Sequence, residues 1–231
     1  PKLLDFIDAL SLNMQRRALN EQVVKKLAFK YEANILRNYE RKMVDLFDRQ
    51  IITSEIDKIA IGDYNTIHVI PNGVDIDFFS FSNGNRDNKI ILFTGRMAYF
   101  PNAEAAMYFT KKVFPLIKKV VKEAQFYIVG VDPPRNVQKL GEIDGVNVLG
   151  RVPVIHEYLS KCAVFVAPVL SGSGIQNKVL EAMASGIPCV VTKYAIGAIK
   201  AFHGIHCLIG SNETELAEHV IKLLEDKKLG E

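Results

Sequence analysis

From residue 89 onward, short apolar segments alternate with longer amphipathic ones, and this alternation limits the fold more than any other feature. The segments IILFTG, QFYIVG, VNVLG and AVFVAP are apolar on both strand faces, which is typical of buried strands. Helical patterns separate them, and Asn102 is the predicted N-cap of the first helix. The pattern predicts an α/β fold: a doubly wound parallel sheet with helices on both faces.

The residues before this region show a different pattern and predict part of a second domain. Apolar residues recur about every four positions between residues 10 and 47, which predicts one or two amphipathic helices. A strand at 49–54, a short helix ending at Gly62 and a strand halted by the turn at 71–73 follow. We expect a helical and strand segment at 1–75, a linker at 76–88 and the main domain at 89–231.

Composition excludes several classes of partner. The 231 residues carry 29 basic and 26 acidic side chains, a net charge of +3, with no basic tract for nucleic acid. No apolar run approaches the roughly 20 residues of a spanning helix. Three cysteines without Cys-x-x-Cys spacing, Cys162, Cys189 and Cys207, indicate reduced thiols. We expect a cytoplasmic protein, with contact to the inner membrane face as an open alternative.

The stretch SGSGIQNKVLEAMASGIPCVV is a candidate anion site. It leaves a predicted strand and enters a predicted helix, where free backbone N–H groups and the helix dipole favour an anion. Gly172 and Gly174 would let the backbone approach an oxyanion, and Lys178 would add a positive charge. The stretch is not a Walker A loop, and Asn177 stands where the dinucleotide fingerprint requires its third glycine.

Two other charged residues share the predicted carboxyl-end rim of the sheet, where ligands of doubly wound domains bind. Glu181 lies three residues after Lys178, on the same helical face. The alternative for this pair is an ordinary surface salt bridge of little energetic value. Arg96 follows a strand-ending glycine, so its guanidinium could clamp a diphosphate, or simply bond the end of a helix.

Six motifs together resemble one known family. VIPNGVD, TGRM, IVG, VNVLGRVP, VFVAP and GSGIQNKVLEAMASGIPCVVT resemble, in order and spacing, the nucleotide-sugar-binding half of group 1 (family 4) retaining glycosyltransferases with the GT-B fold. The resemblance covers residues 67 to about 226 and implies a Rossmann-like sheet. The preceding segment resembles the end of the family's acceptor-side domain, which implies that 1–75 is an incomplete domain.

The resemblance implies a function for the candidate residues. A UDP- or GDP-sugar would bind at the rim, and its sugar would pass with retention to a glycan or lipid-linked acceptor in polysaccharide synthesis. Arg96 and Lys178 would stabilise the leaving diphosphate, Glu181 would bind the ribose hydroxyls, and no metal or other cofactor would be required. The implied substrate-binding residues are Gly95, Arg96, Gly150, Arg151, Val152, Gly172, Ser173, Gly174, Ile175, Gln176, Asn177, Lys178 and Glu181.

Two departures from the family pattern keep alternatives open. Ser173 stands where many members have a glutamate that contacts the donor sugar, and Pro101 where a second basic residue is usual. The family's catalytic histidine is expected outside this sequence, so we expect nucleotide binding without efficient transfer. A non-catalytic nucleotide-binding module and a GT-B type UDP-N-acetylglucosamine epimerase remain alternatives.

Two further clusters carry weaker hypotheses. Lys111, Lys112, Lys118 and Lys119 could meet anionic lipid, although a solvated helix face is the ordinary explanation. His203, His206 and Cys207 could suggest a metal, but no fourth ligand follows at a useful spacing, and we expect none.

Overall fold

The computed structural model describes residues 1–19, 21–81 and 86–226, with only the backbone of Asn88 described. Residues 82–85 of the predicted linker and 227–231 of the predicted main domain therefore lie outside the described residues. The chain forms two compact units. The first comprises Pro1–Gly73, Leu170–Gln176 and Ile196–Lys200, and the second comprises the rest from Val74 onward.

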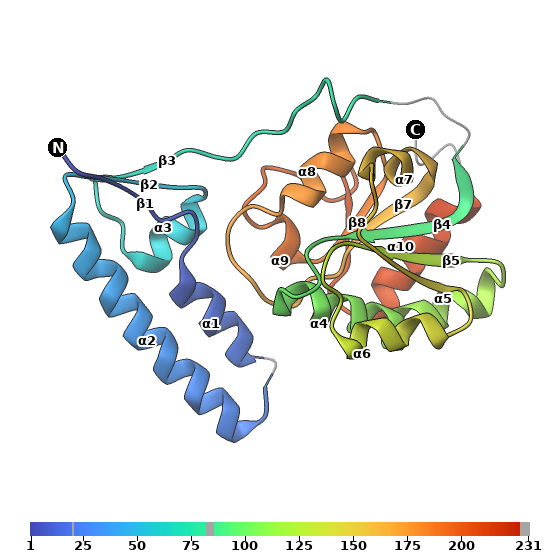
Figure 1. The fold of residues 1–231 in the computed structure, drawn as a ribbon, viewed down its shortest axis with the longest axis horizontal. Helices are drawn as coiled ribbons and strands as arrows, with labels where there is room; N and C mark the ends of the chain where they lie inside the picture. Colours follow the sequence, from blue (N-terminus) through green and yellow to red (C-terminus); the bar gives the residue numbers. More distant parts are fainter. Residues whose placement is uncertain (20, 82–85, 227–231) are drawn as a thin grey trace. The chain divides into compact units, whose positions relative to one another are not determined.

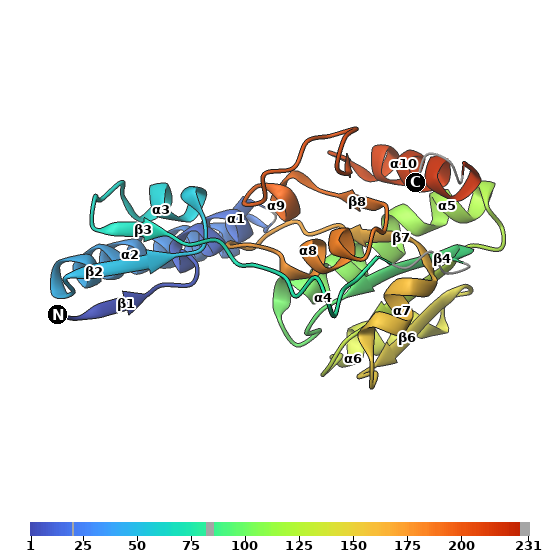
Figure 2. The same ribbon diagram turned by 90° about the horizontal axis from the view of Figure 1, so that it is seen from above.

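The first unit is built on a three-stranded parallel sheet. Its strands β1 (Leu3–Asp5), β2 (Arg49–Ile52) and β3 (Ile67–Val69) lie in the order β1-β2-β3. The helices are α1 (Leu10–Leu19), α2 (Val23–Leu46) and α3 (Glu55–Ile61), and α1 and α2 lie side by side (Figures 1 and 2). A small core of Ala9, Val44, Ile52, Ile61 and Ile67 joins these elements.

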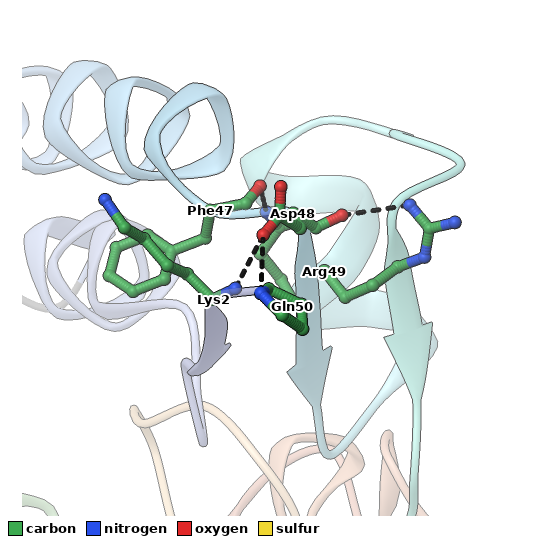
Figure 3. Close-up of polar contacts among 6 residues, drawn as sticks. Lys2, Phe47, Asp48, Arg49 and Gln50 are labelled. Carbon is green, nitrogen blue, oxygen red and sulfur yellow. Dashed lines mark hydrogen bonds and ion pairs between the residues drawn. The ribbon is translucent and has the colours of Figure 1, made fainter.

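Buried polar side chains fix the helices of this unit to its sheet. Gln50 is fully buried and donates to the carbonyl oxygen of Val44 at 2.9 Å. It also donates to the carbonyl oxygen of Phe47 at 2.8 Å, and Figure 3 shows both of these residues. These bonds satisfy carbonyl groups at the end of α2 that have no partner inside the helix. The buried carboxylate of Glu40 accepts from the amide of Ser11 at 3.0 Å and from its hydroxyl at 2.5 Å, which fixes α1 against α2.

The second unit contains a six-stranded sheet in the order β6-β5-β4-β7-β8-β9, with every pair parallel. This order confirms the predicted doubly wound parallel sheet. The strands are β4 (Asp87–Thr94), β5 (Gln125–Val129), β6 (Val146–Gly150), β7 (Cys162–Ala167), β8 (Cys189–Val191) and β9 (Leu208–Ile209).

Helices cover both faces of this sheet (Figure 1). The helices α4 (Phe100–Tyr108), α5 (Phe114–Val120) and α10 (Glu213–Glu225) lie on one face, and a π-helical turn, Phe109–Val113, joins α4 to α5. The helices α7 (Ile155–Lys161) and α8 (Asn177–Ala184) lie on the other. The short helices are α6 (Arg135–Gln138), with a 3₁₀ turn at Lys139–Glu142, and α9 (Lys193–Ile196).

The two asparagines at helix starts behave differently. Asn212 caps α10, because its side-chain oxygen accepts from the amide of Glu215 at 2.9 Å. The predicted N-cap role of Asn102 is wrong, because α4 begins at Phe100 and Tyr99 is its N-cap. The proline at 101 fits the first turn of the helix, where its missing N–H costs nothing. The side chain of Asn102 is thereby available for contacts outside its own helix.

The three thiols are free and buried. Burial raises the pKa of Cys162 to about 12 and also raises the pKa values of Cys189 and Cys207. Within the part of the chain that the structure describes, no helix is long and apolar enough to cross a membrane.

Candidate functional site

Three glycines lie at the carboxyl ends of neighbouring strands in the second unit. The amide of Gly95, after β4, donates to the carbonyl of Val129 at 3.1 Å, and the amide of Gly130, after β5, donates to the carbonyl of Gly150 at 2.8 Å. A side chain on Gly130 would place its Cβ 1.6 Å from the carbonyl oxygen of Gly95. Glycine is therefore required at position 130, and the three strand ends form one closely packed rim.

The strand order reverses between β4 and β7, and such a switch point is where open α/β sheets bind ligands. Arg96 follows β4 at this point, and its side chain is exposed. Its only ion pair among the described residues joins Nε to a carboxylate oxygen of Asp132 at 3.8 Å, and both side chains are exposed. Such a pair contributes little to stability, so the guanidinium is available to an incoming anion.

Lys178, in the first turn of α8, is held at the same rim. Its ammonium group donates a hydrogen bond to the side-chain oxygen of Asn102 and lies 5.1 Å from the ring centroid of Phe93. The side-chain nitrogen of Asn102 donates to the carbonyl oxygen of Arg96 at 3.0 Å. Asn102 therefore joins the start of α8 to the turn after β4.

Burial shifts the pKa values of Lys178 and Glu181, which lie on the same helix. Desolvation lowers the pKa of Lys178 to about 8, and the nearby Glu181 carboxylate only partly offsets this effect. Desolvation raises the pKa of Glu181, and Lys178 acts against that shift. Among the described residues, no ion pair within 4.0 Å joins Lys178 to Glu181.

The turn after β6 leaves open space at the rim. Gly150 has a φ of 66°, and a Cβ added there would meet nothing within 4 Å. Arg151 is exposed and Val152 is partly buried. The hydrogen bond from Gly130 to Gly150 connects this turn to the rim at Gly95.

The glycine loop of residues 170–176 belongs to the first unit, where two charged side chains hold its backbone. Arg16 of α1 donates from Nη1 to the carbonyl of Gly172 at 2.7 Å. The amide of Gly174 donates to a carboxylate oxygen of Asp57 at 3.0 Å. The amide predicted to face an oxyanion is therefore already bonded to a carboxylate.

The other predicted loop residues differ in exposure. Ser173 is 5% exposed, and its hydroxyl oxygen has no hydrogen-bond partner among the residues the structure describes. Ile175 and Gln176 are partly buried, and Asn177, the first residue of α8, is exposed.

The predicted residues thus fall into two sets. In the second unit, hydrogen bonds of Asn102 connect Lys178 to Arg96. Gly95, which precedes Arg96, lies against Gly130, and the amide of Gly130 bonds to Gly150. Glu181 follows Lys178 on the same helix. The loop residues 172–176 are held in the first unit by Arg16 and Asp57.

Sequence reasoning missed the residues that position both sets. The Ser54-x-x-Asp57 spacing is a recognisable capping pattern, and Ser54 does cap α3. Nothing local, however, signals that Asp57 also binds the glycine loop, or that Asn102 binds Lys178.

The histidines near Cys207 make local hydrogen bonds. Nδ1 of His203 accepts from the amide of Ile209 at 2.9 Å, and Nδ1 of His206 accepts from the amide of Phe202 at 3.1 Å. No group of three or more His, Cys, Asp or Glu side chains that could hold a metal ion occurs in residues 1–19, 21–81 and 86–226.

Two known proteins are similar in sequence to this chain over part of their own length. An uncharacterized 44.6 kDa protein in the cps region of Klebsiella pneumoniae is 24% identical over 211 residues, 86% of this chain and 53% of that protein. EpsF of Bacillus subtilis strain 168 is 25% identical over 139 residues, 54% of this chain and 36% of EpsF. The chain thus spans about half the length, or less, of these relatives.

The fold is also found in solved structures. The crystal structure of HepE from Anabaena in complex with UDP and glucose matches with a TM-score of 0.71 at 17% identity, over 99% of this chain and 63% of HepE. At this level of identity the likeness shows the fold alone. The family described as "Glycosyl transferases group 1" matches residues 88–226, the segment that carries the sheet and its rim. Because this match covers more than half of the 231 residues, the chain belongs to the group 1 glycosyl transferases.

Proposed function

We propose that this protein takes part in transferring a sugar from a UDP-linked donor to a glycan or lipid-linked acceptor, with retention of the anomeric configuration. The observation that carries the proposal is the Lys178 ammonium group, held by Asn102 beside the Arg96 turn at the switch point of the sheet. We choose a uridine nucleotide for this proposal because HepE, which shares this fold, was solved in complex with UDP and glucose.

The proposed chemistry is electrostatic. As the bond between sugar and diphosphate breaks, negative charge builds up on the leaving diphosphate, and Lys178 and Arg96 would stabilise that charge. A desolvated ammonium interacts more strongly with an anion than a hydrated one does, because the local dielectric constant is lower. This stabilisation requires no metal ion.

Glu181 would bind the ribose of the donor. It lies in the first two turns of α8, close enough to Lys178 for each to shift the pKa of the other. An ionised carboxylate accepts hydrogen bonds from two neighbouring hydroxyl groups, and such charge-assisted bonds are strong.

Feeding the purified protein labelled nucleotide sugars tests the proposal. UDP-glucose, UDP-N-acetylglucosamine and GDP-mannose would each be supplied with lipid and glycan acceptors, and the label would be followed by mass spectrometry. We expect label to reach an acceptor from a UDP-sugar only, and slowly, because the family's catalytic histidine is expected outside this sequence. Label in an epimer would instead identify an epimerase, and tight binding of GDP without UDP would contradict the donor assignment.

A second candidate is a nucleotide-binding module without transfer activity. The buried Ser173 hydroxyl, at the position where the family pattern predicts a glutamate, favours it. Binding of UDP with no label reaching acceptor, water or epimer would support this candidate.

Contact with a membrane surface is a separate part of the proposal. Lys111, Lys112 and Lys119 are exposed, whereas Lys118 pairs with Asp144 at 2.8 Å. Co-sedimentation with anionic vesicles, lost on replacing the three exposed lysines by glutamine, would support membrane contact. Unchanged co-sedimentation of that variant would contradict a role for these lysines.

A further inference from the structure

Two neutral groups of the second unit hold the ammonium group of Lys178. It donates a hydrogen bond to the side-chain oxygen of Asn102 and lies 5.1 Å from the ring centroid of Phe93, which is fully buried. An amide oxygen and the face of an aromatic ring both attract a cation without carrying a negative charge. These two contacts therefore fix the direction of the ammonium group without neutralising it.

The side chain of Asn102 can adopt only one orientation in this contact. Asn102 is 6% exposed, and its side-chain nitrogen donates to the carbonyl oxygen of Arg96 at 3.0 Å. A carbonyl oxygen can only accept, so the NH₂ group must face Arg96, and the amide oxygen is left for Lys178. One buried amide thus bonds to both residues that carry the positive charges proposed for diphosphate binding.

The turn that carries Arg96 is itself fixed by backbone hydrogen bonds. The amide of Met97 donates to the carbonyl of Val131 at 2.9 Å, and the carbonyl of Arg96 also accepts from the amide of Tyr99 at 3.1 Å. The side chain of Arg96, in contrast, is exposed. The hydrogen bond from Asn102 therefore ends on a fixed backbone, and it sets how far the Lys178 ammonium group lies from that backbone.

Gly95 leaves the space that the amide of Asn102 occupies. A Cβ built on Gly95 would lie 2.8 Å from the side-chain nitrogen of Asn102 and 3.0 Å from its Cγ. Carbon atoms pack at roughly 3.5–4.0 Å, so any side chain at position 95 would displace the amide. The glycine that follows β4 is thus matched to the asparagine in the first turn of α4.

Two cations held against one fixed turn suit a ligand with two adjacent anionic groups. We propose that Asn102 is a positioning residue, which holds Lys178 at the turn of Arg96 and so makes the site select a nucleoside diphosphate over a monophosphate. Asn102 acts through these two cations and not by touching the ligand. This inference rests on the proposed function, because it assigns both cations to the diphosphate of the donor.

The electrostatics of Lys178 provide a readout for this role. Burial lowers the pKa of Lys178 to about 8, and the carboxylate of Glu181, on the same helix, partly offsets that shift. A carboxylate at position 102 would add a negative charge in direct contact with the ammonium group and so raise this pKa. The other described charged residues on the segments that hold Lys178 do not shift its pKa; they are Glu104 on α4, Arg96, and Asp87 and Lys89 at the start of β4.

Calorimetry with UDP and UMP tests the proposed selectivity. Both nucleotides would be titrated into the wild type, Asn102→Ala and the control Asn38→Ala, which changes an exposed asparagine of α2. We expect UDP to bind more tightly than UMP to the wild type and to the control. Asn102→Ala should reduce this difference about 10-fold and leave the Kd for UMP within about threefold of the wild-type value, because only the diphosphate needs both cations.

A second variant gives a result that a purely structural role would not produce. Asn102→Asp keeps the shape of the side chain but pairs Lys178 with a carboxylate, so UDP should bind about 10-fold more weakly than to the wild type at about pH 7. In the wild type, the loss of UDP affinity with rising pH is expected near pH 8. In Asn102→Asp this loss should move above about pH 9, because the pKa of Lys178 is raised.

The outcomes separate this inference from the function on which it rests. Equal losses for UDP and UMP in Asn102→Ala would overturn the inference, because the residue would then support the fold or the nucleoside. Unchanged binding of both nucleotides, or a pH dependence that is the same in Asn102→Asp and the wild type, would overturn it and leave the proposed function intact. A wild type that binds UMP as tightly as UDP would exclude the selectivity, and one that binds neither nucleotide would overturn both proposals.

Discussion

Lys178 donates a hydrogen bond to Asn102, and this contact joins the first turn of α8 to the rim turn that follows β4. Because a neutral amide, not a carboxylate, receives the ammonium group, the positive charge of Lys178 is oriented but not neutralised. An oriented and desolvated cation is well suited to bind a diphosphate.

Removal of this charge should weaken nucleotide binding. Lys178→Ala should raise the Kd for UDP about 10- to 100-fold, because a hydrogen bond to a charged group is lost. Lys119→Ala, which removes an exposed lysine of α5, is the control and should leave the Kd unchanged. Calorimetry would measure both, and equal Kd values for Lys178→Ala and the wild type would refute a role for this lysine.

Nucleotide affinity should also depend on pH. With a pKa lowered to about 8, Lys178 carries its proton below that pH and loses it above. Affinity for UDP should therefore fall as the pH rises from about 7 to about 9, by up to the effect of Lys178→Ala. An arginine remains charged over this range, so Lys178→Arg should show a flatter profile, and identical slopes for both proteins would contradict the assignment.

The ribose contact of Glu181 can be measured by changing protein and ligand together. Glu181→Gln should weaken UDP binding about 10-fold, because a neutral amide accepts hydrogen bonds less strongly than a carboxylate. The same variant should hardly affect 2′,3′-dideoxy-UDP, which lacks the hydroxyl groups. A similar loss for both ligands would show that Glu181 acts elsewhere.

The close packing of the rim predicts an unequal cost for two glycine substitutions in the second unit. Gly130→Ala should destabilise the protein by about 2–3 kcal/mol, because its Cβ would collide with the backbone oxygen of Gly95. Gly204, with a φ of 76° and open space around it, is the matched control. Gly204→Ala should cost about 1–2 kcal/mol from its conformation alone. Urea unfolding would compare the two, and an equal cost would exclude the collision as the cause.

Asp8 should make the stability of the protein depend on pH. Its pKa is raised from 3.8 to about 6 in the fold, so ionisation is disfavoured there and stability is lost as the pH rises from about 4 through 6. Asp8→Asn should therefore be more stable than the wild type at pH 8, by about 1–2 kcal/mol after allowance for solvent screening. Thermal unfolding followed by circular dichroism should show this gain vanish below about pH 4. A gain of the same size at both pH values would point to packing instead.

Much of the fold was predictable because its signals are local. Apolar runs gave the strands of the parallel sheet, and the Asn212 cap follows from side-chain and backbone groups three residues apart. Asn102 was assigned wrongly for the same reason: its composition suits a cap, but the tertiary contact with Lys178, 76 residues away, decides where its side chain lies.

The sequence by itself determined the parallel α/β architecture of the second unit and the positions of Arg96, Lys178 and Glu181 near strand ends or in the first turns of a helix. Hydrophobic period and turn chemistry act over a few residues and can be seen in any short window. Only the tertiary structure decided that Asp57, 117 residues from Gly174, takes the amide of that glycine, and that the Asp8 carboxylate lies against it. Burial and hydrogen-bond partners depend on which distant segments pack together, and local pattern does not record them.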